Sequence, residues 1–297
     1  MCVVSFLNEA RYLGTFLDSV AGQLRFPDLL VLVDDGSSDA SAEIASEFAA
    51  QREDVRVLRR PQRPAERDRL AQAAELRAFQ WGLEQIDVPW DVVVKMDADL
   101  QLSSDLFQTM ERAFLGRPTL GIAGGYLAVV DERTGRLCRE PCPRSHVRGP
   151  TKFYRRACFE QISPIPAFLG WDTIDEITAR MRGWDAISLA CAQGDTLHLR
   201  PTGRADGRLR AQYRWGHCAY GIGQHPLWVL LSTGRRVRDR PHGLAALAFL
   251  VGWLTAALRG HQRAAPQVRA YGRGEQLAEL RRRVRALAPR RWSEIAF

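Results

Sequence analysis

The chain has 297 residues, of which 46% are hydrophobic and 26% are charged, so it can build a large core and is not a disordered protein. Its net charge is +8, from 42 basic and 34 acidic residues, and the basic residues crowd the second half. This charge suits an anionic partner. Because no nucleic-acid-binding motif accompanies it, we expect a nucleotide ligand or an acidic lipid and no nucleic acid.

The cysteines and the N-terminus indicate a cytoplasmic protein. Only Cys138 and Cys142 of the six cysteines are close in sequence, and no second pair completes a zinc site, so reduced thiols are expected. The first residues read directly as a strand, which predicts no signal peptide. The apolar stretch 244–258 is shorter than a comfortable bilayer span.

The first hundred residues alternate between apolar runs and amphipathic segments. This pattern predicts an α/β fold with a doubly wound, mostly parallel sheet and helices on both faces. A charged loop is expected over 59–69. The expected strands are 2–6, 29–33, 55–58 and 92–97, and the expected helices are 10–23, 40–50 and 70–85.

Acidic residues follow three of these strands. Asp97 and Asp99 close the fourth strand, Asp34 and Asp35 the second, and Asn8-Glu9 the first. Ligands of open α/β sheets bind at the carboxyl ends of the strands, so these side chains are expected at one edge. Two carboxylates that close repel each other, and a divalent cation that also binds phosphate oxygens would relieve the repulsion. An ordinary acidic turn is the alternative for an isolated D-x-D.

Further along, we expect a helix over 104–115, a strand over 122–130 and an antiparallel excursion over 131–147. Residues 154–156 are expected to open a short helix that ends at 162. A helix over 170–182 carries Asp172, Asp175 and Glu176 on one face of its first turns. These acids are candidates for catalysis, although acids in a first turn also serve the helix dipole.

The composition changes at Pro226, which predicts a catalytic domain over 1–225 and a C-terminal helical, partly apolar extension over 226–297. Its expected helices are 227–236, 244–259 and 275–287. Apolar helices beside arginines suit the surface of an anionic membrane. We therefore expect a peripheral location at the inner face of the cell membrane. A helical appendage packed on the catalytic domain, or a dimer contact, is the alternative.

The motifs of residues 1–200 together resemble family 2 glycosyltransferases with the GT-A fold. They are V-V-S-F-L-N-E-A-R-Y-L at the start, V-D-D-G-S-S-D after the second strand, D-A-D after the fourth, and W-D-T-I-D-E followed by R-M-R-G-W. The resemblance implies an inverting transfer from a nucleotide-diphosphate sugar, usually a UDP-sugar, with Mg or Mn as a cofactor. Acceptors in this family are often lipid-linked sugars. The implied role is in cell-surface or exopolysaccharide biosynthesis.

Carried over residue by residue, the resemblance places Asn8 and Glu9 at the nucleoside end of the donor. Asp35 would meet the base with Asp34 beside it. Asp97 would face the ribose and the surroundings of the metal, and Asp99 would ligate the metal.

The general base is expected at Asp172, with Asp175 and Glu176 as rivals. The family has a Glu-Asp motif at this point, and Trp171 stands here in place of its Glu. His198 is a candidate for a further metal ligand or a satisfied polar residue at a strand end. Arg155 is a candidate for the diphosphate or a surface arginine.

Two other functions compete with the leading one. A nucleotidyl or sugar-phosphate transferase would need a Gly-rich, basic loop after the first strand, and Leu7-Asn8-Glu9 does not provide it. A catalytically inactive nucleotide-binding module would not need the acids at 35, 97, 99 and 172.

Overall fold

The structure is a computed structural model, and the chain forms two compact units, residues 1–206 and 207–297. Helix α7 (Arg208–Gly221) packs along a helix of the second unit, whereas the division expected at 225/226 assigned it to the first. The described residues are 1–61, 68–131, 134–200, 207–239 and 241–287.

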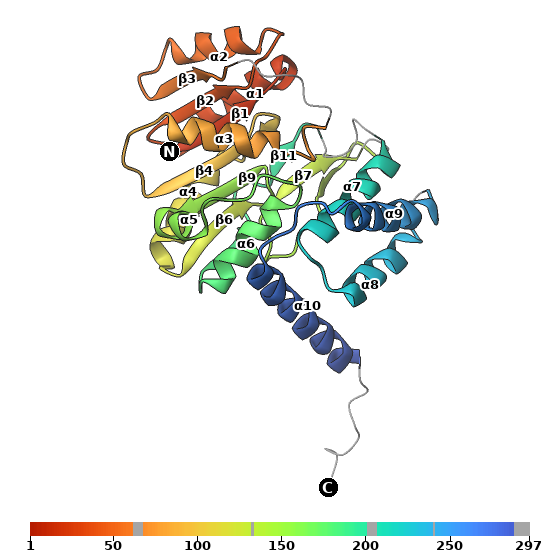
Figure 1. Ribbon diagram of the computed structural model, residues 1–297. Coiled ribbons are helices and arrows are strands. Elements are labelled where there is room, and N and C mark those ends of the chain that lie inside the picture. The colour runs from red at the N-terminus through yellow and green to blue at the C-terminus, as the bar shows by residue number, and fades with distance from the viewer. Residues whose placement is uncertain (62–67, 132–133, 201–206, 240, 288–297) are drawn as a thin grey trace. The chain divides into compact units, whose positions relative to one another are not determined.

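A seven-stranded sheet forms the centre of the first unit (Figure 1). Its strand pairs are parallel except for those of β9, which runs antiparallel between β4 and β6. The mostly parallel sheet predicted from the alternating pattern is therefore confirmed. In spatial order the strands are β10 (Asp185–Leu189), β6 (Leu120–Gly125), β9 (Thr151–Arg155), β4 (Val92–Asp97), β1 (Cys2–Phe6), β2 (Leu30–Asp34) and β3 (Val55–Arg59).

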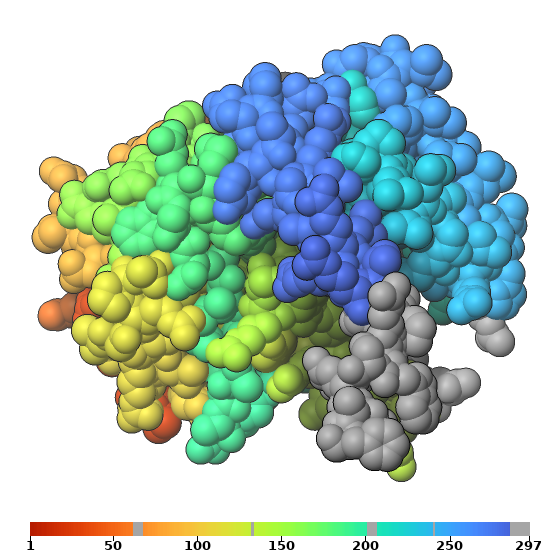
Figure 2. Space-filling model, turned by 90° about the horizontal axis from the view of Figure 1, so that it is seen from below, coloured from red at the N-terminus to blue at the C-terminus, as the bar shows by residue number. Residues whose placement is uncertain are grey.

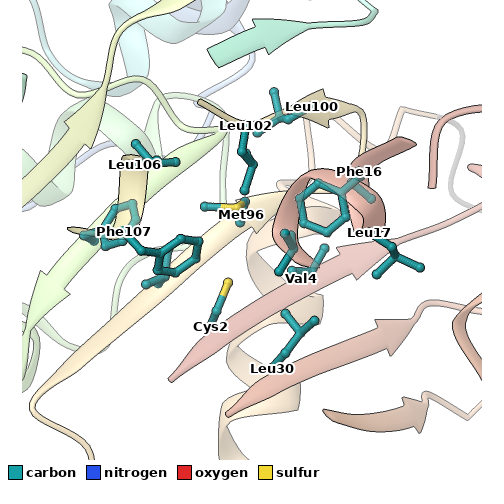
Figure 3. Packing of buried hydrophobic residues seen from close by; sticks show 14 of the residues in the cluster. Cys2, Val4, Phe16, Leu17, Leu30, Met96, Leu100, Leu102, Leu106 and Phe107 are labelled. Carbon is teal, nitrogen blue, oxygen red and sulfur yellow. The ribbon is translucent and has the colours of Figure 1, made fainter. Parts of the chain in front are cut away.

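Helices cover both faces of this sheet, and a separate hydrophobic cluster lies under each layer. Val3 and Val4 of β1 enter different clusters, because successive side chains of a strand point to opposite faces. Figure 3 shows one cluster, in which Phe16, Met96 and Phe107 come together from a helix, a strand and a second helix. Helices α1 (Ala10–Ala21), α2 (Ser41–Ala49) and α4 (Leu106–Gly116) contribute to this cluster, and α3 (Ala74–Glu84), α5 (Arg156–Ile162) and α6 (Trp171–Met181) to the other.

The first unit also contains a second, four-stranded sheet. The single strand expected over 122–130 was wrong: β6 ends at Gly125, and the chain continues after Tyr126 in the other sheet. A continuous apolar run does not reveal that the chain changes sheets. The expected antiparallel excursion is present as β8. In spatial order the strands are β5 (Leu100–Gln101), β11 (Thr196–His198), β7 (Leu127–Val130) and β8 (Leu137–Arg139).

Strand β9 is an element that the sequence did not predict, since residues 154–156 were expected to open a helix. Its first four residues are all buried, Lys152 included, so the strand is covered on both faces. The charged residues of the segment are not typical of such a strand, and the sequence therefore did not indicate it. The chain approaches β6 closely here, because a Cβ on Gly124 would lie 2.2 Å from the carbonyl oxygen of Thr151. Helix α5 then follows directly.

The second unit consists of helices, as expected for this part of the chain. Helices α7 and α9 pack through reciprocal glycines: a Cβ on Gly216 would lie 2.0 Å from the Phe249 carbonyl oxygen, and one on Gly252 would lie 2.1 Å from that of Tyr213. Within the described residues, no helix is both long and apolar enough to cross a membrane. Besides α7, the helices are α8 (Pro226–Arg236), α9 (Leu244–Leu258) and α10 (Pro266–Leu287), the last longer than the expected 275–287.

Candidate active site

The register of the central strands brings the predicted acids to one edge. Phe6 of β1 lies beside Asp34 of β2, and Ser5 lies beside Asp97 of β4. The three strands therefore end level with one another, and the loops that follow them start at the same edge of the sheet. This is the arrangement expected for a ligand site in an open α/β sheet.

The loops after β1 and β2 are locked together at this edge. Asn8 has a φ of +55° and accepts hydrogen bonds from the amide and the hydroxyl of Ser38, at 2.8 and 3.3 Å. Its own amide donates to the Ser37 hydroxyl at 3.1 Å. Asp34 accepts from the amides of Gly36 and Ser37, at 3.1 and 2.7 Å. The V-D-D-G-S-S-D motif thus shapes its own turn, and Asp34 helps to hold that turn.

Asp35 points to a different set of partners. Its carboxylate is 1% exposed and lies 2.6 Å from Arg60 Nη1 and 2.5 Å from Arg69 Nη2. Both arginines belong to the charged loop that the sequence placed between the third strand and the next helix. The sequence identified the loop but gave no sign that Arg60 and Arg69 pair with Asp35.

The D-A-D motif lies at the end of β4 with its two acids in different environments. Asp97 accepts a hydrogen bond from the ammonium of Lys95, which also donates to the Gly149 carbonyl oxygen at 3.2 Å. The Asp99 carbonyl oxygen accepts from the Leu199 amide at 2.9 Å, and this bond brings His198 beside the motif. His198 Nε2 lies 3.8 Å from Asp99 Oδ1. His198 therefore lies beside Asp99, whereas Asp97 is paired with Lys95.

Arg200 connects this motif to the first loop. Its guanidinium donates to Asp99 at 3.2 Å and to Glu9. Burial raises the pKa of Glu9 to about 6 even though Arg200 opposes the shift. Burial and the neighbouring Asp97 likewise raise the pKa of Asp99. The cluster holds more negative charge than Arg200 alone balances, which favours a further cation.

His198 is held from its other side by Glu140. Its Nδ1 lies 3.3 Å from a Glu140 oxygen, and Arg148 holds the second oxygen at 2.5 Å. Burial disfavours the charged carboxylate, but His198 and Arg148 outweigh it and lower the pKa of Glu140. An ionised carboxylate only accepts, so a hydrogen bond between Glu140 and His198 requires a proton on Nδ1, and Nε2 is the ring nitrogen that lies toward Asp99. This is how a metal-ligating histidine is usually oriented.

The donor types fit a divalent cation, but the side chains do not form a closed cage. Carboxylate oxygens at 97 and 99 suit Mg or Mn, and the imidazole of His198 suits Mn better. The second oxygen of Glu9 is buried and has no hydrogen-bond partner in the described part of the chain. Among the described side chains, no three His, Cys, Asp or Glu residues gather closely enough to enclose a metal ion.

The three candidate acids of α6 have very different surroundings. Asp175 is buried and accepts from Lys152 at 2.7 and 2.8 Å and from the Tyr154 hydroxyl at 2.6 Å. Burial raises its pKa to about 6, and Lys152 opposes that shift. Glu176 is also buried, accepts from the Val147 amide at 2.6 Å, and lies 2.9 Å from His146. These two acids are engaged in holding α6 against β9 and the segment before it.

Asp172 is the acid that remains available. Its side chain is partly exposed, and none of the described residues donates a hydrogen bond to its carboxylate. One of its oxygens lies 3.4 Å from the position that a Cβ on Gly149 would occupy. Lys95 reaches the carbonyl of that same glycine from the side of Asp97. Asp172 and, through Lys95, Asp97 therefore both lie near Gly149.

Arg155 is the predicted site residue that the structure does not bring to this edge. Strand β9 runs antiparallel to β4, so Arg155 lies opposite Val92, at the start of that strand. Its guanidinium donates to the carbonyl oxygens of Phe114, Arg117 and Leu120, at 2.6, 3.0 and 2.8 Å. It holds the end of α4 at the far edge of the sheet and is not placed to contact a ligand there.

Comparison with known proteins identifies the family. Residues 1–161 match the family described as Glycosyl transferase family 2, which is more than half of the chain. No curated protein sequence is significantly similar to it.

Solved structures at low identity share the fold. The mannosyltransferase PcManGT from Pyrobaculum calidifontis, in complex with GDP-Man and Mn2+, has a TM-score of 0.53 and 17% identity, covering 98% of this chain and 80% of that one. S. aureus TarS 1-349 with UDP-GlcNAc has a TM-score of 0.51 and 14% identity, covering 88% and 72%. Glucosyl-3-phosphoglycerate synthase from Mycobacterium tuberculosis, with Mn2+, UDP-glucose and phosphoglyceric acid, has a TM-score of 0.52 and 18% identity, covering 75% and 81%. The chain therefore belongs to glycosyl transferase family 2 and is a glycosyltransferase with the GT-A fold.

Proposed function

We propose that the protein transfers a sugar, with inversion, from a nucleotide-diphosphate sugar to a hydroxyl group of a glycan or a lipid-linked acceptor. The observation that supports this most directly is that Asp172 and, through Lys95, Asp97 both lie near Gly149. An inverting transfer needs charge stabilisation on the diphosphate side of the sugar and a base on the other side. The two groups of acids supply these two functions from different segments.

On the donor side, Asp97 and Asp99, with His198, would hold Mg or Mn. When bound, the cation stabilises the negative charge that develops on the diphosphate as the glycosidic bond breaks. Because the side chains do not enclose an ion by themselves, oxygens of the nucleotide diphosphate would complete its coordination. Asn8, Glu9, Asp34 and Asp35 line the nucleoside end, either directly or by holding the loops in place. The three solved structures above bind GDP-Man, UDP-GlcNAc and UDP-glucose, and we expect a UDP-sugar here.

On the acceptor side, Asp172 would remove the proton of the attacking hydroxyl. A general base needs a carboxylate that is free to reach the substrate, and Asp172 meets this condition better than its neighbours on α6. Asp175 and Glu176 are committed to Lys152, Tyr154 and His146. The base is therefore assigned to Asp172 on the availability of its side chain.

The second unit would place the enzyme at an anionic membrane, where lipid-linked acceptors reside and cell-surface polysaccharides are built. On α9, the residues that face the other helices are buried, whereas an apolar stripe on the opposite side is exposed, with Leu247 at 56% and Leu258 at 86%. Helices α8 and α9 (light blue) form part of the surface seen in Figure 2. The stripe consists of Leu244, Leu247, Val251, Leu254 and Leu258.

Charge and length both favour contact with the membrane surface. The α8 residues Leu227, Leu230 and Leu231 are also exposed, and Arg235 follows Leu231 by one helical turn. A 15-residue helix is about 22 Å long, too short to span but suited to lie in the interface. We therefore expect peripheral binding at the cytoplasmic face. In a flotation assay, the protein should float with anionic liposomes, and a Leu247→Glu/Leu254→Glu variant should not. Equal recovery of both in the soluble fraction would exclude this surface.

A donor screen tests the activity. Purified protein is incubated with a panel of nucleotide-diphosphate sugars, with Mn or Mg, and release of nucleoside diphosphate is measured. A nucleotidyltransferase would instead consume a nucleoside triphosphate and release pyrophosphate, and an inactive binding module would release neither.

Asp172→Asn tests the base. Loss of a general base lowers turnover by about 10²- to 10⁴-fold, and we expect a loss in this range with nucleotide affinity kept. Asp172→Asn should also keep the wild-type melting temperature, because none of the described residues donates a hydrogen bond to the Asp172 carboxylate. Near-native turnover would reject Asp172 as the base.

A further inference from the structure

The chain contains only two lysines, and both lie at the candidate active site. Of its 42 basic residues all except Lys95 and Lys152 are arginines. The antiparallel register of β4 and β9 places the two lysines directly opposite each other. Their side chains are 2% and 0% exposed. They therefore project from the same face of the sheet into the space under α6.

This placement is costly for the fold. Like charges in directly opposed positions destabilise a pair of strands, and each buried ammonium loses its hydration. Replacing a whole buried ion pair with apolar residues of similar volume is often neutral or stabilising. Stability alone therefore does not explain why Lys95 and Lys152 occupy these two positions.

Trp171 lies against both ammonium groups. The centre of its ring is 5.3 Å from Lys95 Nζ and 5.6 Å from Lys152 Nζ, within the range of cation–π attraction. Its indole N–H donates to Glu75 of α3 at 3.0 Å, which fixes the orientation of the ring. The side chain that precedes Asp172 thus compensates part of the charge that the lysines bring.

Each lysine holds a different half of the site. Lys95 donates to Asp97 of the D-A-D motif and to the Gly149 carbonyl. Lys152 donates to the backbone carbonyl of Asp172 and to the carboxylate of Asp175, so it holds the first turn of α6. A continuous chain of contacts through Lys95, Trp171 and Lys152 therefore joins the donor-side acid to the backbone that carries the base.

We propose that Lys95, Trp171 and Lys152 form a positioning unit that fixes the Asp172 carboxylate relative to Asp97. This assignment rests on the proposed function, since that function gives Asp97 and Asp172 their roles. The ammonium of lysine is a compact charge with three donors on a flexible stem, which suits a position between the ring and several oxygens. None of the three residues touches the reacting atoms. They act by setting the separation between donor and base, where a displacement of about 1 Å costs about 100-fold in rate.

The test uses the presence of only two lysines. Protein grown with 13C-labelled lysine should give two ε-methylene signals, and both should be shifted by the ring of Trp171. In Trp171→Leu both signals should move. The matched control is Trp184→Leu, because the Trp184 indole also donates a hydrogen bond of 3.0 Å, but to Gln161 and not to a partner of Lys95 or Lys152. The control should leave both signals in place.

Kinetics complete the test. We expect Trp171→Leu to lower kcat by about 10- to 100-fold, while its Kd for nucleoside diphosphate stays within threefold of the wild-type value. In the control, Trp184→Leu, both kcat and Kd should stay within threefold of the wild-type values. Trp171→Phe keeps an aromatic ring but loses the hydrogen bond to Glu75. It should keep most of the ring-induced shift of the two lysine signals, and its kcat should lie between those of wild type and Trp171→Leu. If Trp171→Leu does not fold, Trp171→Phe is compared with Trp184→Phe by the same two measurements, the positions of the lysine signals and kcat.

Three results would overturn the proposal: unmoved lysine signals, a wild-type kcat, or equal losses in the Trp171 and Trp184 variants. A wild-type protein that transfers no sugar would instead refute the proposed function. An active wild type with an equally active Trp171→Leu variant would refute the positioning role alone.

Discussion

Replacing Lys152 with Met should destabilise the first unit strongly. Lys152 is fully buried and pairs with two buried carboxylates, those of Asp175 and Glu176, at 2.7 and 3.2 Å. Removing one member of a buried ion pair leaves uncompensated charge and costs about 3–5 kcal/mol. For a unit of this size each kcal/mol corresponds to about 2–4 °C, so Tm should fall by about 6–20 °C.

The loss should depend on pH in a defined direction. Burial raises the pKa of Asp175 to about 6, so the folded protein favours its protonated form. As the pH rises from the ordinary carboxyl pKa through 6, Asp175 ionises in its buried position and the free energy of unfolding falls. Lys152 reduces this loss because it pairs with the ionised carboxylate. Lys152→Met should therefore lose more stability at pH 8 than at pH 5, where Asp175 becomes neutral. Lys152→Met/Asp175→Asn should recover part of the loss at pH 8.

Thermal unfolding followed by calorimetry at pH 5 and pH 8 measures both effects. Arg156→Met is the control, since Arg156 and Glu160 form an ion pair at 2.8 Å that is 52% and 60% exposed. Such exposed pairs contribute about 0–1 kcal/mol. The reasoning fails if the two variants lose similar amounts of stability, or if the loss in Lys152→Met is the same at both pH values.

Two further variants test individual residues of the site. Glu140→Gln should weaken Mn2+ binding by about 10- to 100-fold, as measured by electron paramagnetic resonance without substrate, because the amide no longer fixes the His198 tautomer. Unchanged Mn2+ affinity would remove Glu140 from the site. Arg155→Met should leave nucleotide affinity and turnover unchanged while lowering Tm, because its guanidinium binds the backbone carbonyls of Phe114, Arg117 and Leu120 at the end of α4 and the start of β6. A selective loss of nucleotide binding would restore Arg155 to the donor site.

Much of the site follows from local sequence patterns. Apolar runs that end in Asp34 and Asp97 read as parallel strands, and parallel strands of one sheet end at the same edge. That rule alone brings the two acids into neighbouring positions, as the register confirms. The turn residues of V-D-D-G-S-S-D also explain why the loop after β2 folds on itself and onto Asn8.

The roles of the acids on α6 depend on contacts that no local pattern contains. Asp172 and Asp175 are three residues apart and read alike, yet one is free and the other is buried against Lys152 and Tyr154. The difference depends on β9, which was not recognised as a strand because it contains the charged residues Lys152 and Arg155. Its antiparallel direction also carries Arg155 to the wrong edge for ligand binding.

The sequence by itself determined the family, the mostly parallel sheet and the edge at which the acids gather, because these depend on periodicity and on residues adjacent in the chain. Only the tertiary structure decided which acids are paired with cations and that the two lysines lie opposite each other and both contact Trp171. Apart from Lys95–Asp97, the pairings with acids join residues separated by about 20 to 190 positions, and they depend on strand order and register. A one-residue shift of β9 would move Lys152 to the other face of the sheet, and no feature of its local sequence sets that register.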